Sequence, residues 1–307
     1  MKKPAIPASF RRISNLMGIY SIVHGLLIWI GCSQLALWVY HFEAWPLPLR
    51  LSADAFLIIA AGMGMFLLGS LGHEGFHGNL NRSRKLSMLM GIVASTAVPT
   101  FCSVGLNAYH WRHHAKTNTH EDPDFGLYGQ RQGLASKSIG PMLTSAYCMR
   151  NTARLLNGSE TLERGFPFSV LEMRRFAWFN VSVVGIVTAA WVYLLVRDAE
   201  AFIFTLALPA LVGQVYWTLH PYIEHADTGV SPRDNARDCT SPILQFLLLG
   251  YTFHHCHHLF PSVPAHRLPA LRRYLEASGY LNDETPVQRS LVGALRVGVM
   301  RTIGGPR

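Results

Sequence analysis

The sequence predicts an all-α integral membrane protein with four transmembrane helices in two hairpins. Of its 307 residues, 50% are hydrophobic and only 15% are charged, whereas soluble chains average about 25% charged residues. Four stretches also reach the ~20 mostly apolar residues that a membrane-spanning helix needs. These predicted spans cover about residues 18–40, 53–71, 176–196 and 201–219.

The connections between the spans define the two hairpins. Only the proline-broken stretch HFEAWPLPLR lies between the first two spans, and only RDAE lies between the last two. Basic residues flank the opposite ends of the spans, and the positive-inside rule places those ends in the cytoplasm. They are Lys2, Lys3, Arg11 and Arg12 before the first span, Arg82, Arg84 and Lys85 after the second, and Arg174 and Arg175 before the third. We therefore expect a multi-pass protein of a bacterial inner membrane with cytoplasmic termini.

Two further apolar stretches are less suited to crossing a membrane. Residues 87–104 are interrupted by Pro99 and predict a shallow or re-entrant segment, and residues 241–253 predict an interfacial segment. Because no repeat or separate soluble domain is visible, we expect one membrane domain over residues 1–307. Lys plus Arg number 27 against 18 Asp plus Glu. No basic stripe with interleaved aromatic residues accompanies this excess, so nucleic acid is not an expected partner.

Three histidine-rich motifs, here called histidine boxes, fall on the cytoplasmic side of this topology. The second and third boxes have the spacing i, i+3, i+4, which places three side chains on one face of a helix. The first has the spacing i, i+4. The boxes are GHEGFHGN with His73 and His77, YHWRHHAKTN with His110, His113 and His114, and FHHCHHLFPSVP with His254, His257 and His258.

The eight box histidines predict metal binding. Packed together they would repel one another when protonated, whereas a metal ion holds imidazoles neutral. One tetrahedral zinc takes only four ligands, so eight suit two metal ions of higher coordination number, and imidazole suits iron. The five cysteines form no CxxC pair, which argues against a thiolate site. We therefore expect two metal ions bound by imidazole, and iron is a metal that suits these ligands.

A competing interpretation comes from the first box. The stretch HEGFH matches the motif HExxH, in which two histidines bind zinc and the glutamate is the general base of a metalloprotease. A membrane zinc metalloprotease is therefore an alternative, although it leaves the other two boxes without a role. Glu74 can instead accept a hydrogen bond from the free N–H of a metal-bound histidine.

The boxes and their surroundings resemble the membrane fatty acid desaturase family. The resemblance is carried by HWRHHAKTNTHEDPDF around the second box and most specifically by HHCHHLFPSVPAHRLPALRRYL around the third. It implies four spans, a cytoplasmic helical cap that carries the boxes, and a non-haem di-iron centre bound almost wholly by histidine. It also implies an additional histidine ligand between the second and third boxes.

The same resemblance implies O2-dependent oxidation of a long acyl chain, most simply desaturation to a C=C bond. Related members hydroxylate, introduce keto groups into carotenoids or form terminal alkenes, and the boxes do not separate these outcomes. Expected partners are a lipid or acyl-chain substrate, the membrane, and an external electron donor. We expect that donor to be a ferredoxin-like or small haem protein with its reductase.

Acidic residues beside the boxes are candidates to orient the ligands. A carboxylate that accepts the second ring N–H of a metal-bound histidine fixes its tautomer and orientation. Each of these acids is equally compatible with an ordinary solvated loop. The candidates are Glu74, Asp122, Asp124 and Glu224, with Glu121 as a further neighbour.

His225 is the predicted additional ligand, although His255 has more histidine neighbours in sequence. On a helix, His255 is rotated about 100° from His254 and away from the face of the third box. His225 follows the fourth predicted span on the side where the boxes gather, and its segment YIEH resembles the family. His220 is the competing candidate. We treat His24, His41, His120, His220 and His266 as non-ligands.

Overall fold

The computed structural model describes residues 3–129, 131–162 and 165–303, and these are mostly helical, with two short strands. Four of the helices are long and apolar enough to cross a membrane, namely Asn15–Tyr40, Leu47–His77, Val170–Arg197 and Ala199–His225. The predicted all-α fold with four candidate spans is thereby confirmed. The arrangement as membrane hairpins and the cytoplasmic position of the cap stay predictions.

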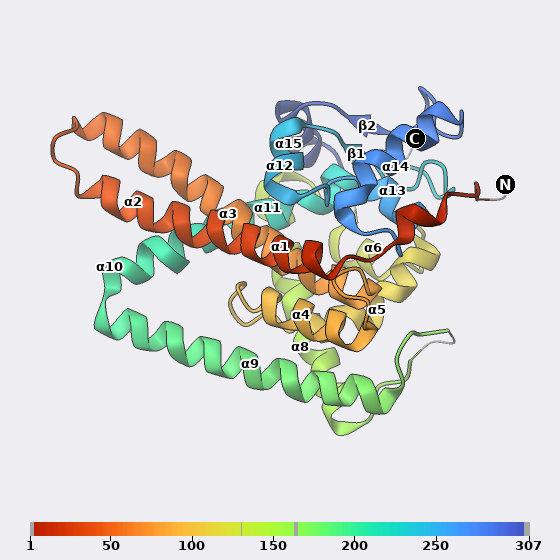
Figure 1. The fold of residues 1–307 in the computed structure, drawn as a ribbon, viewed down its shortest axis with the longest axis horizontal. Helices are drawn as coiled ribbons and strands as arrows, with labels where there is room; N and C mark the ends of the chain where they lie inside the picture. The colour runs from red at the N-terminus through yellow and green to blue at the C-terminus, as the bar shows by residue number, and fades with distance from the viewer. Residues whose placement is uncertain (1–2, 130, 163–164, 304–307) are drawn as a thin grey trace.

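The spanning helices extend from one end of the molecule, and the shorter helices gather at the other end, as Figure 1 shows. The first span consists of α1 (Asn15–Leu26), a π-helical turn (Leu27–Gly31) and α2 (Cys32–Tyr40). The second and third spans are the continuous helices α3 (Leu47–His77) and α9 (Val170–Arg197). The fourth span consists of α10 (Ala199–Phe202), a π-helical turn (Ile203–Ala207) and α11 (Leu208–His225).

The shorter elements form the cap. They are a 3₁₀ helix (Ala8–Arg11), α4 (Arg84–Ser95), α5 (Ser103–Lys116), α6 (Pro123–Tyr128), α7 (Gly133–Lys137), α8 (Ile139–Asn157), α12 (Pro242–Leu248), α13 (His254–Leu259), a 3₁₀ helix (Ala265–Arg267), α14 (Leu268–Ala277) and α15 (Leu291–Met300). Two short parallel strands, β1 (Asp238–Cys239) and β2 (Val287–Gln288), pair within the cap.

The second and fourth spans continue further than hydropathy predicts. The predicted spans end at Leu71 and Leu219, whereas α3 continues to His77 and α11 continues to His225. Hydropathy falls where His73 and His220 follow, but most of the polar side chains beyond them are buried and the backbone remains helical. His73, His77 and His225 therefore lie on the cap ends of spanning helices rather than on loops.

Neither of the weaker apolar stretches forms a candidate span. Residues 87–104 divide between α4 and the start of α5, with the break around Pro99, where the chain cannot continue a regular helix. Residues 241–253 form the short helix α12 and the turn that leads to α13. The depth of both segments in a membrane stays a prediction.

Helix α3 is the centre of the packing. Of its most apolar window, 72% is buried, against 6% for α9, whose apolar side chains are left to face lipid. A Cβ atom on Gly75 would lie 2.8 Å from Cα of Gly91, so α3 and α4 approach more closely than any larger residue allows. This contact fixes the end of α3 that carries His73 and His77.

The first and fourth spans are joined by hydrogen bonds at their π-helical turns. A π-helical turn interrupts the regular i to i−4 bonding and leaves backbone groups available to other partners. Nε1 of Trp29 donates a hydrogen bond to the carbonyl oxygen of Thr205 at 2.7 Å, and Gln34 donates to Oγ1 of the same threonine at 3.0 Å. Each of these bonds joins the two spans beside α3.

Candidate metal centre

The first of two histidine clusters joins three helices. His73 and His77 come from α3, His110 and His114 from α5, and His257 from α13. The ligand atoms of this five-histidine cluster all lie within 4.8 Å of one another. Nε2 of His257 lies 3.2 Å from Nε2 of His114. The cluster therefore draws on residues separated by as many as 184 positions, which only the folded chain brings together.

The second cluster lies beside the first and includes the isolated histidine. It consists of His113 from α5, His225 from α11, and His254 and His258 from α13, all four buried. Nε2 of His254 lies 3.0 Å from Nε2 of His225 and 2.9 Å from Nε2 of His258. Nε2 of His113 lies 3.3 Å from Nε2 of His258. Four Nε2 atoms thus converge on one small volume.

Each long box contributes to both clusters. In α5, the i, i+4 pair His110 and His114 enters the five-histidine cluster, while His113 enters the four-histidine cluster. In α13, the i, i+4 pair His254 and His258 enters the four-histidine cluster, while His257 crosses to the other. The two clusters are therefore neighbours that share two helices, as a two-metal site requires.

The chemistry of the donor set fits two transition-metal ions. Burial, reinforced by repulsion from neighbouring imidazoles, lowers the pKa of five cap histidines well below its usual range; they are His110, His114, His254, His257 and His258. Neutral imidazole is the form that binds iron. Nε2 of His77 and Nε2 of His110 are buried without a hydrogen-bond partner among the described residues, and a metal ion would satisfy both.

His113 is held by two carboxylates. Its Nδ1 donates to Oδ1 of Asp122 at 2.9 Å and lies 3.4 Å from Oδ2 of Asp124. Burial opposes protonation of His113, but Asp124 and Asp122 outweigh it and raise the pKa of His113 to about 9. Asp122 is itself fixed by the backbone N–H groups of Asn118 and Asp124. This arrangement orients the ring with Nε2 directed at the cluster, where a bound metal ion would displace the proton that the carboxylates stabilise.

Two positioning contacts are not among the candidates predicted from the sequence. Nδ1 of His225 donates to the carbonyl oxygen of Asn235 at 3.0 Å, and Oγ1 of Thr117 lies 3.2 Å from Nδ1 of His258. Each leaves the Nε2 atom of its histidine facing the four-histidine cluster. A backbone carbonyl has no sequence signature, and the position of Thr117 one helical turn after His113 is its only signal.

Glu224 and Glu74 lie beside the clusters in different ways. Oε2 of Glu224 is 3.3 Å from Nδ1 of His254 and 2.9 Å from Nε2 of His220. Oε1 of Glu74 is 3.7 Å from Nδ1 of His73, which is too long for a hydrogen bond. Glu74 therefore does not orient His73 through such a bond in this structure.

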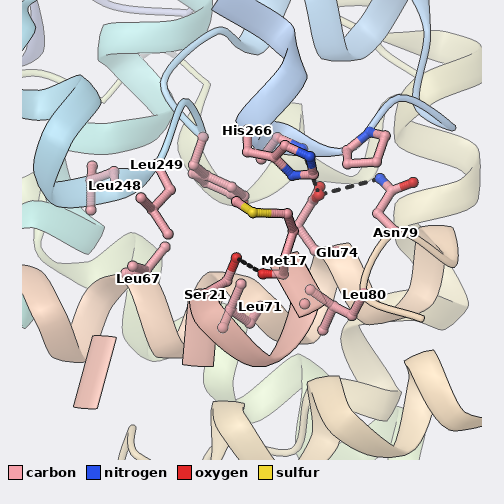
Figure 2. A pocket seen from close by; sticks show the side chains of 14 residues that line it. Met17, Ser21, Leu67, Leu71, Glu74, Asn79, Leu80, Leu248, Leu249 and His266 are labelled. Carbon is pink, nitrogen blue, oxygen red and sulfur yellow. Dashed lines mark hydrogen bonds between the residues drawn. The ribbon is translucent and has the colours of Figure 1, made fainter. Parts of the chain in front are cut away.

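Glu74 instead connects α3 to the segment after the third box. Its Oε2 accepts hydrogen bonds from the backbone N–H of Ala265 at 3.0 Å and from Asn79 at 3.3 Å. Asn79 also donates to the carbonyl oxygen of Pro261. Figure 2 shows Glu74 and Asn79 joined in this way, with His266 beside them. A carboxylate engaged by two donors is poorly placed to act as a general base.

The remaining histidines lie outside both clusters of the described chain. Nε2 of His255 is directed at the carbonyl oxygen of Pro232 at 3.1 Å, as its helical rotation predicts. His24 contacts the carbonyl oxygen of Phe246, and His41 pairs with Glu200. His120, His220 and His266 belong to neither cluster. The nine predicted ligands are thus the nine histidines that the structure brings together, and metal binding by them stays a prediction.

Two hollows accompany the clusters. A cavity of about 70 Å³ adjoins histidines of both clusters and is also lined by Tyr109, Tyr128 and Thr144. An apolar groove of about 840 Å³ runs between α3, α11, α12 and α15. Tyr216 lines the groove and packs on Phe66, with ring centroids 4.4 Å apart. Phe66 also contacts His220, which lines the cavity.

Replacing Asp122 with alanine is expected to lower iron affinity by about 10- to 100-fold, the usual cost of losing a carboxylate that orients a metal-bound histidine. The measurement is iron per folded protein during titration with a chelator. Glu121→Ala is the matched control, because Glu121 pairs only with Lys116 at the surface among the described contacts. Equal iron retention in both variants would contradict a role for Asp122 in holding His113.

Known proteins resemble this chain over the same region. The sequence model of the fatty acid desaturase family matches residues 51–287, which include all nine clustered histidines. A β-carotene ketolase from Paracoccus sp. (strain PC1) is 25% identical over 258 residues, which cover 81% of this chain and 89% of the ketolase.

Proposed function

We propose that this chain, a member of the fatty acid desaturase family, is a membrane-bound non-haem di-iron oxidoreductase that desaturates a long acyl chain. The observation that carries the proposal is the convergence of nine histidines, seven buried and two half-buried, into two adjoining clusters beside the cap ends of two spanning helices. The five-histidine cluster would hold one iron ion and the four-histidine cluster the other.

The chemistry of the substrate requires a metal. An unactivated C–H bond has no acidic proton that a side chain can remove, so bound iron would supply the oxidising power with O2. In desaturation, two neighbouring CH2 groups lose one hydrogen each and become a C=C bond. Those two hydrogens, two external electrons and two protons reduce O2 to two water molecules.

The residues of this chain would hold the iron ions, orient the histidine ligands and shield the site from water. Asp122 and the carbonyl of Asn235 fix the rings of His113 and His225, so that both Nε2 atoms face the cluster. The apolar groove suits the methylene chain of a lipid-derived substrate. Tyr216 lines this groove and packs on Phe66, which contacts His220 in the cavity wall, so the two rings would limit the access of water and substrate to the histidines.

A second candidate is hydroxylation or ketone formation on the same scaffold. Two observations favour it: the similarity to a β-carotene ketolase, and the polar groups among the residues that line the cavity beside the clusters. Tyr109 lines this cavity, and Oδ1 of Asp124 has no hydrogen-bond partner among the described residues. These groups are able to bind an oxygen atom on a substrate or product, which a plain methylene chain does not present. Formation of terminal alkenes is a third outcome that the same centre would support.

The zinc metalloprotease alternative has less support. It needs Glu74 as a free general base, but Glu74 accepts hydrogen bonds from Ala265 and Asn79. It also leaves His113, His225 and the third box without a function. Metal analysis of the purified protein distinguishes the classes: about two irons per chain is expected for the oxidase, and one zinc for the protease.

Product analysis tests the reaction itself. The protein is expressed in a host that supplies an electron donor and is offered saturated acyl lipids or β-carotene, and the lipids are then analysed by mass spectrometry. Loss of two hydrogens supports desaturation, gain of oxygen supports the second candidate, and loss of a carbon supports alkene formation. A mass spectrum unchanged by the protein, with two irons bound and reductant present, would overturn the proposal.

The proposed location is the bacterial inner membrane, with the clusters on the cytoplasmic side. The loop between α2 and α3 then faces outward, and the chain end at Arg307, outside the described residues, faces the cytoplasm. A reporter fused after Arg307 is expected to be active in the cytoplasm, and one inserted between Trp45 and Pro46 outside it. Activity of both reporters on one side would contradict this topology. The electrons are proposed to come from a ferredoxin-like or small haem protein with its reductase.

A further inference from the structure

A polar pocket of about 330 Å³ opens on the cap between α12, α14 and β2. Its walls carry three guanidinium groups, those of Arg272, Arg273 and Arg289, and one carboxylate, that of Glu276. Helix α14 lies in the cap, at the end of the molecule opposite the far ends of the spanning helices (Figure 1). We call this hollow the arginine pocket.

The arginine pocket has a surplus of positive charge. Arg272 is neutralised, because it pairs with buried Asp238 at 2.6 Å and with Glu276 at 2.8 Å. Arg273 and Arg289 are exposed, and neither side chain makes an ion pair among the described residues. Two guanidinium groups therefore face solvent across the opening, and no carboxylate of the described residues pairs with them.

The buried residue at the floor of the pocket, Phe253, is next in sequence to a histidine of the metal site. Phe253 lines the pocket and is only 3% exposed, and the next residue is His254 of the four-histidine cluster. The carbonyl oxygen of Phe253 also accepts a hydrogen bond from the backbone N–H of His257, a member of the five-histidine cluster. One peptide bond and one hydrogen bond thus connect the floor to both clusters.

We propose that the arginine pocket is the docking site for an acidic one-electron carrier protein. This inference rests on the proposed function, which consumes two electrons per O2. Two reduced carriers would each give up one electron across Phe253, and the electrons would reduce the iron centre that converts O2, two substrate hydrogens and two protons into two waters. Positive patches steer acidic partners and raise association rates by about 10- to 1,000-fold at low ionic strength.

The test reverses the charge of the two unpaired arginines. The variant Arg273→Glu/Arg289→Glu is compared with Arg233→Glu/Arg296→Glu, which changes the net charge equally at two other exposed cap arginines. The probe is a 2Fe–2S ferredoxin with its reductase and NADPH. Binding of this ferredoxin to the purified protein is measured first, and product formation is then measured with ferredoxin or with dithionite as reductant.

The pocket variant is expected to bind ferredoxin at least about tenfold more weakly at low salt, with a flatter salt dependence. Its ferredoxin-supported rate should fall by a similar factor, while its dithionite-supported rate stays within about twofold of the wild type. The control variant should retain both rates. Retained dithionite activity would also show that the pocket variant is folded.

Three results would overturn the docking site. The first is equal ferredoxin binding in both variants and the wild type. The second is a parallel loss of ferredoxin and dithionite activity, which would assign the pocket to substrate binding or folding. The third is loss of bound phosphatidylglycerol, seen by native mass spectrometry, with unchanged ferredoxin binding, which would assign the pocket to a lipid headgroup. If the wild type forms no product with either reductant, the proposed function fails, and the binding comparison still decides the docking site.

Discussion

Replacing His225 with alanine is expected to remove iron and to abolish oxidation, whereas replacing His255 should leave most of both. Nε2 of His225 lies 3.0 Å from Nε2 of His254 in the four-histidine cluster, and its Nδ1 is held by the carbonyl of Asn235. Loss of a metal ligand should exceed the ~10- to 100-fold cost of losing a residue that merely orients one. We therefore expect activity to fall by more than about 100-fold.

His255 provides a demanding comparison because it lies within the third box. It is fully buried, but its Nε2 contacts the carbonyl oxygen of Pro232 and it belongs to neither cluster. Its replacement should cost about 0.5–1.5 kcal/mol of stability through the lost hydrogen bond, because Pro232 is exposed and water can bond to its carbonyl oxygen. Iron per folded protein, measured after removal of aggregates, separates this loss of stability from loss of a ligand.

The reverse outcome would identify an error in the ligand set. If His255→Ala lost iron while His225→Ala kept it, α13 could not be the regular helix that directs His254, His257 and His258 toward the clusters. His220→Ala serves as a second comparison, because Nε2 of His220 lies 2.9 Å from Glu224 and His220 is outside both clusters. Retention of iron in His220→Ala is expected.

Helical spacing predicts much of this site because it is a local property. An i, i+4 pair shares a helix face whatever the helix packs against, so the pairs His73/His77, His110/His114 and His254/His258 are each found within one cluster. The division of each longer box between two clusters, in contrast, depends on tertiary packing and not on local spacing. Whether His113 joins His110 or His258 depends on how α5 crosses α13, and the two helices are 137 residues apart from end to start.

The ends of the second and fourth spans also depend on tertiary packing, which local sequence patterns do not predict. Hydropathy measures side-chain transfer, so the predicted second and fourth spans end just before the first histidine that follows each, His73 and His220. Helix formation follows backbone hydrogen bonding, and α3 and α11 continue until His77 and His225 because buried contacts accommodate their polar side chains. Extending the helices by these turns places the three histidines on rigid elements, which hold ligands more accurately than loops do.

The contacts that Asp238 makes with Cys256 of the third box and with Arg272 were not predicted from the sequence. Asp238, Cys256 and Arg272 come from three separate elements, and no local pattern links them. Asp238 is fully buried and accepts hydrogen bonds from the backbone N–H and the thiol of Cys256, and from Arg272 at 2.6 Å. Cys256 is therefore bonded to Asp238 inside the box and belongs to neither histidine cluster.

Arg272→Met is expected to destabilise the protein by about 3–5 kcal/mol, the usual cost of removing one partner from a buried ion pair. Methionine fills most of the volume of the arginine side chain but leaves the carboxylate of Asp238 buried with only Cys256 as its described donor. Because Asp238 holds α13 through Cys256, iron binding should weaken together with stability. Denaturant unfolding in detergent and iron content measure the two effects.

Glu276→Gln is the matched control for this prediction, since it removes the other partner of the same arginine. The side chain of Glu276 is 47% exposed, and its bond to Arg272 spans one helical turn of α14. An exposed pair of this kind contributes at most about 1 kcal/mol. A large loss in Arg272→Met beside a small loss in Glu276→Gln would place the stabilisation at the buried Asp238. Equal losses in the two variants would show instead that the arginine acts mainly through α14, and that the third box does not depend on Asp238 for its position.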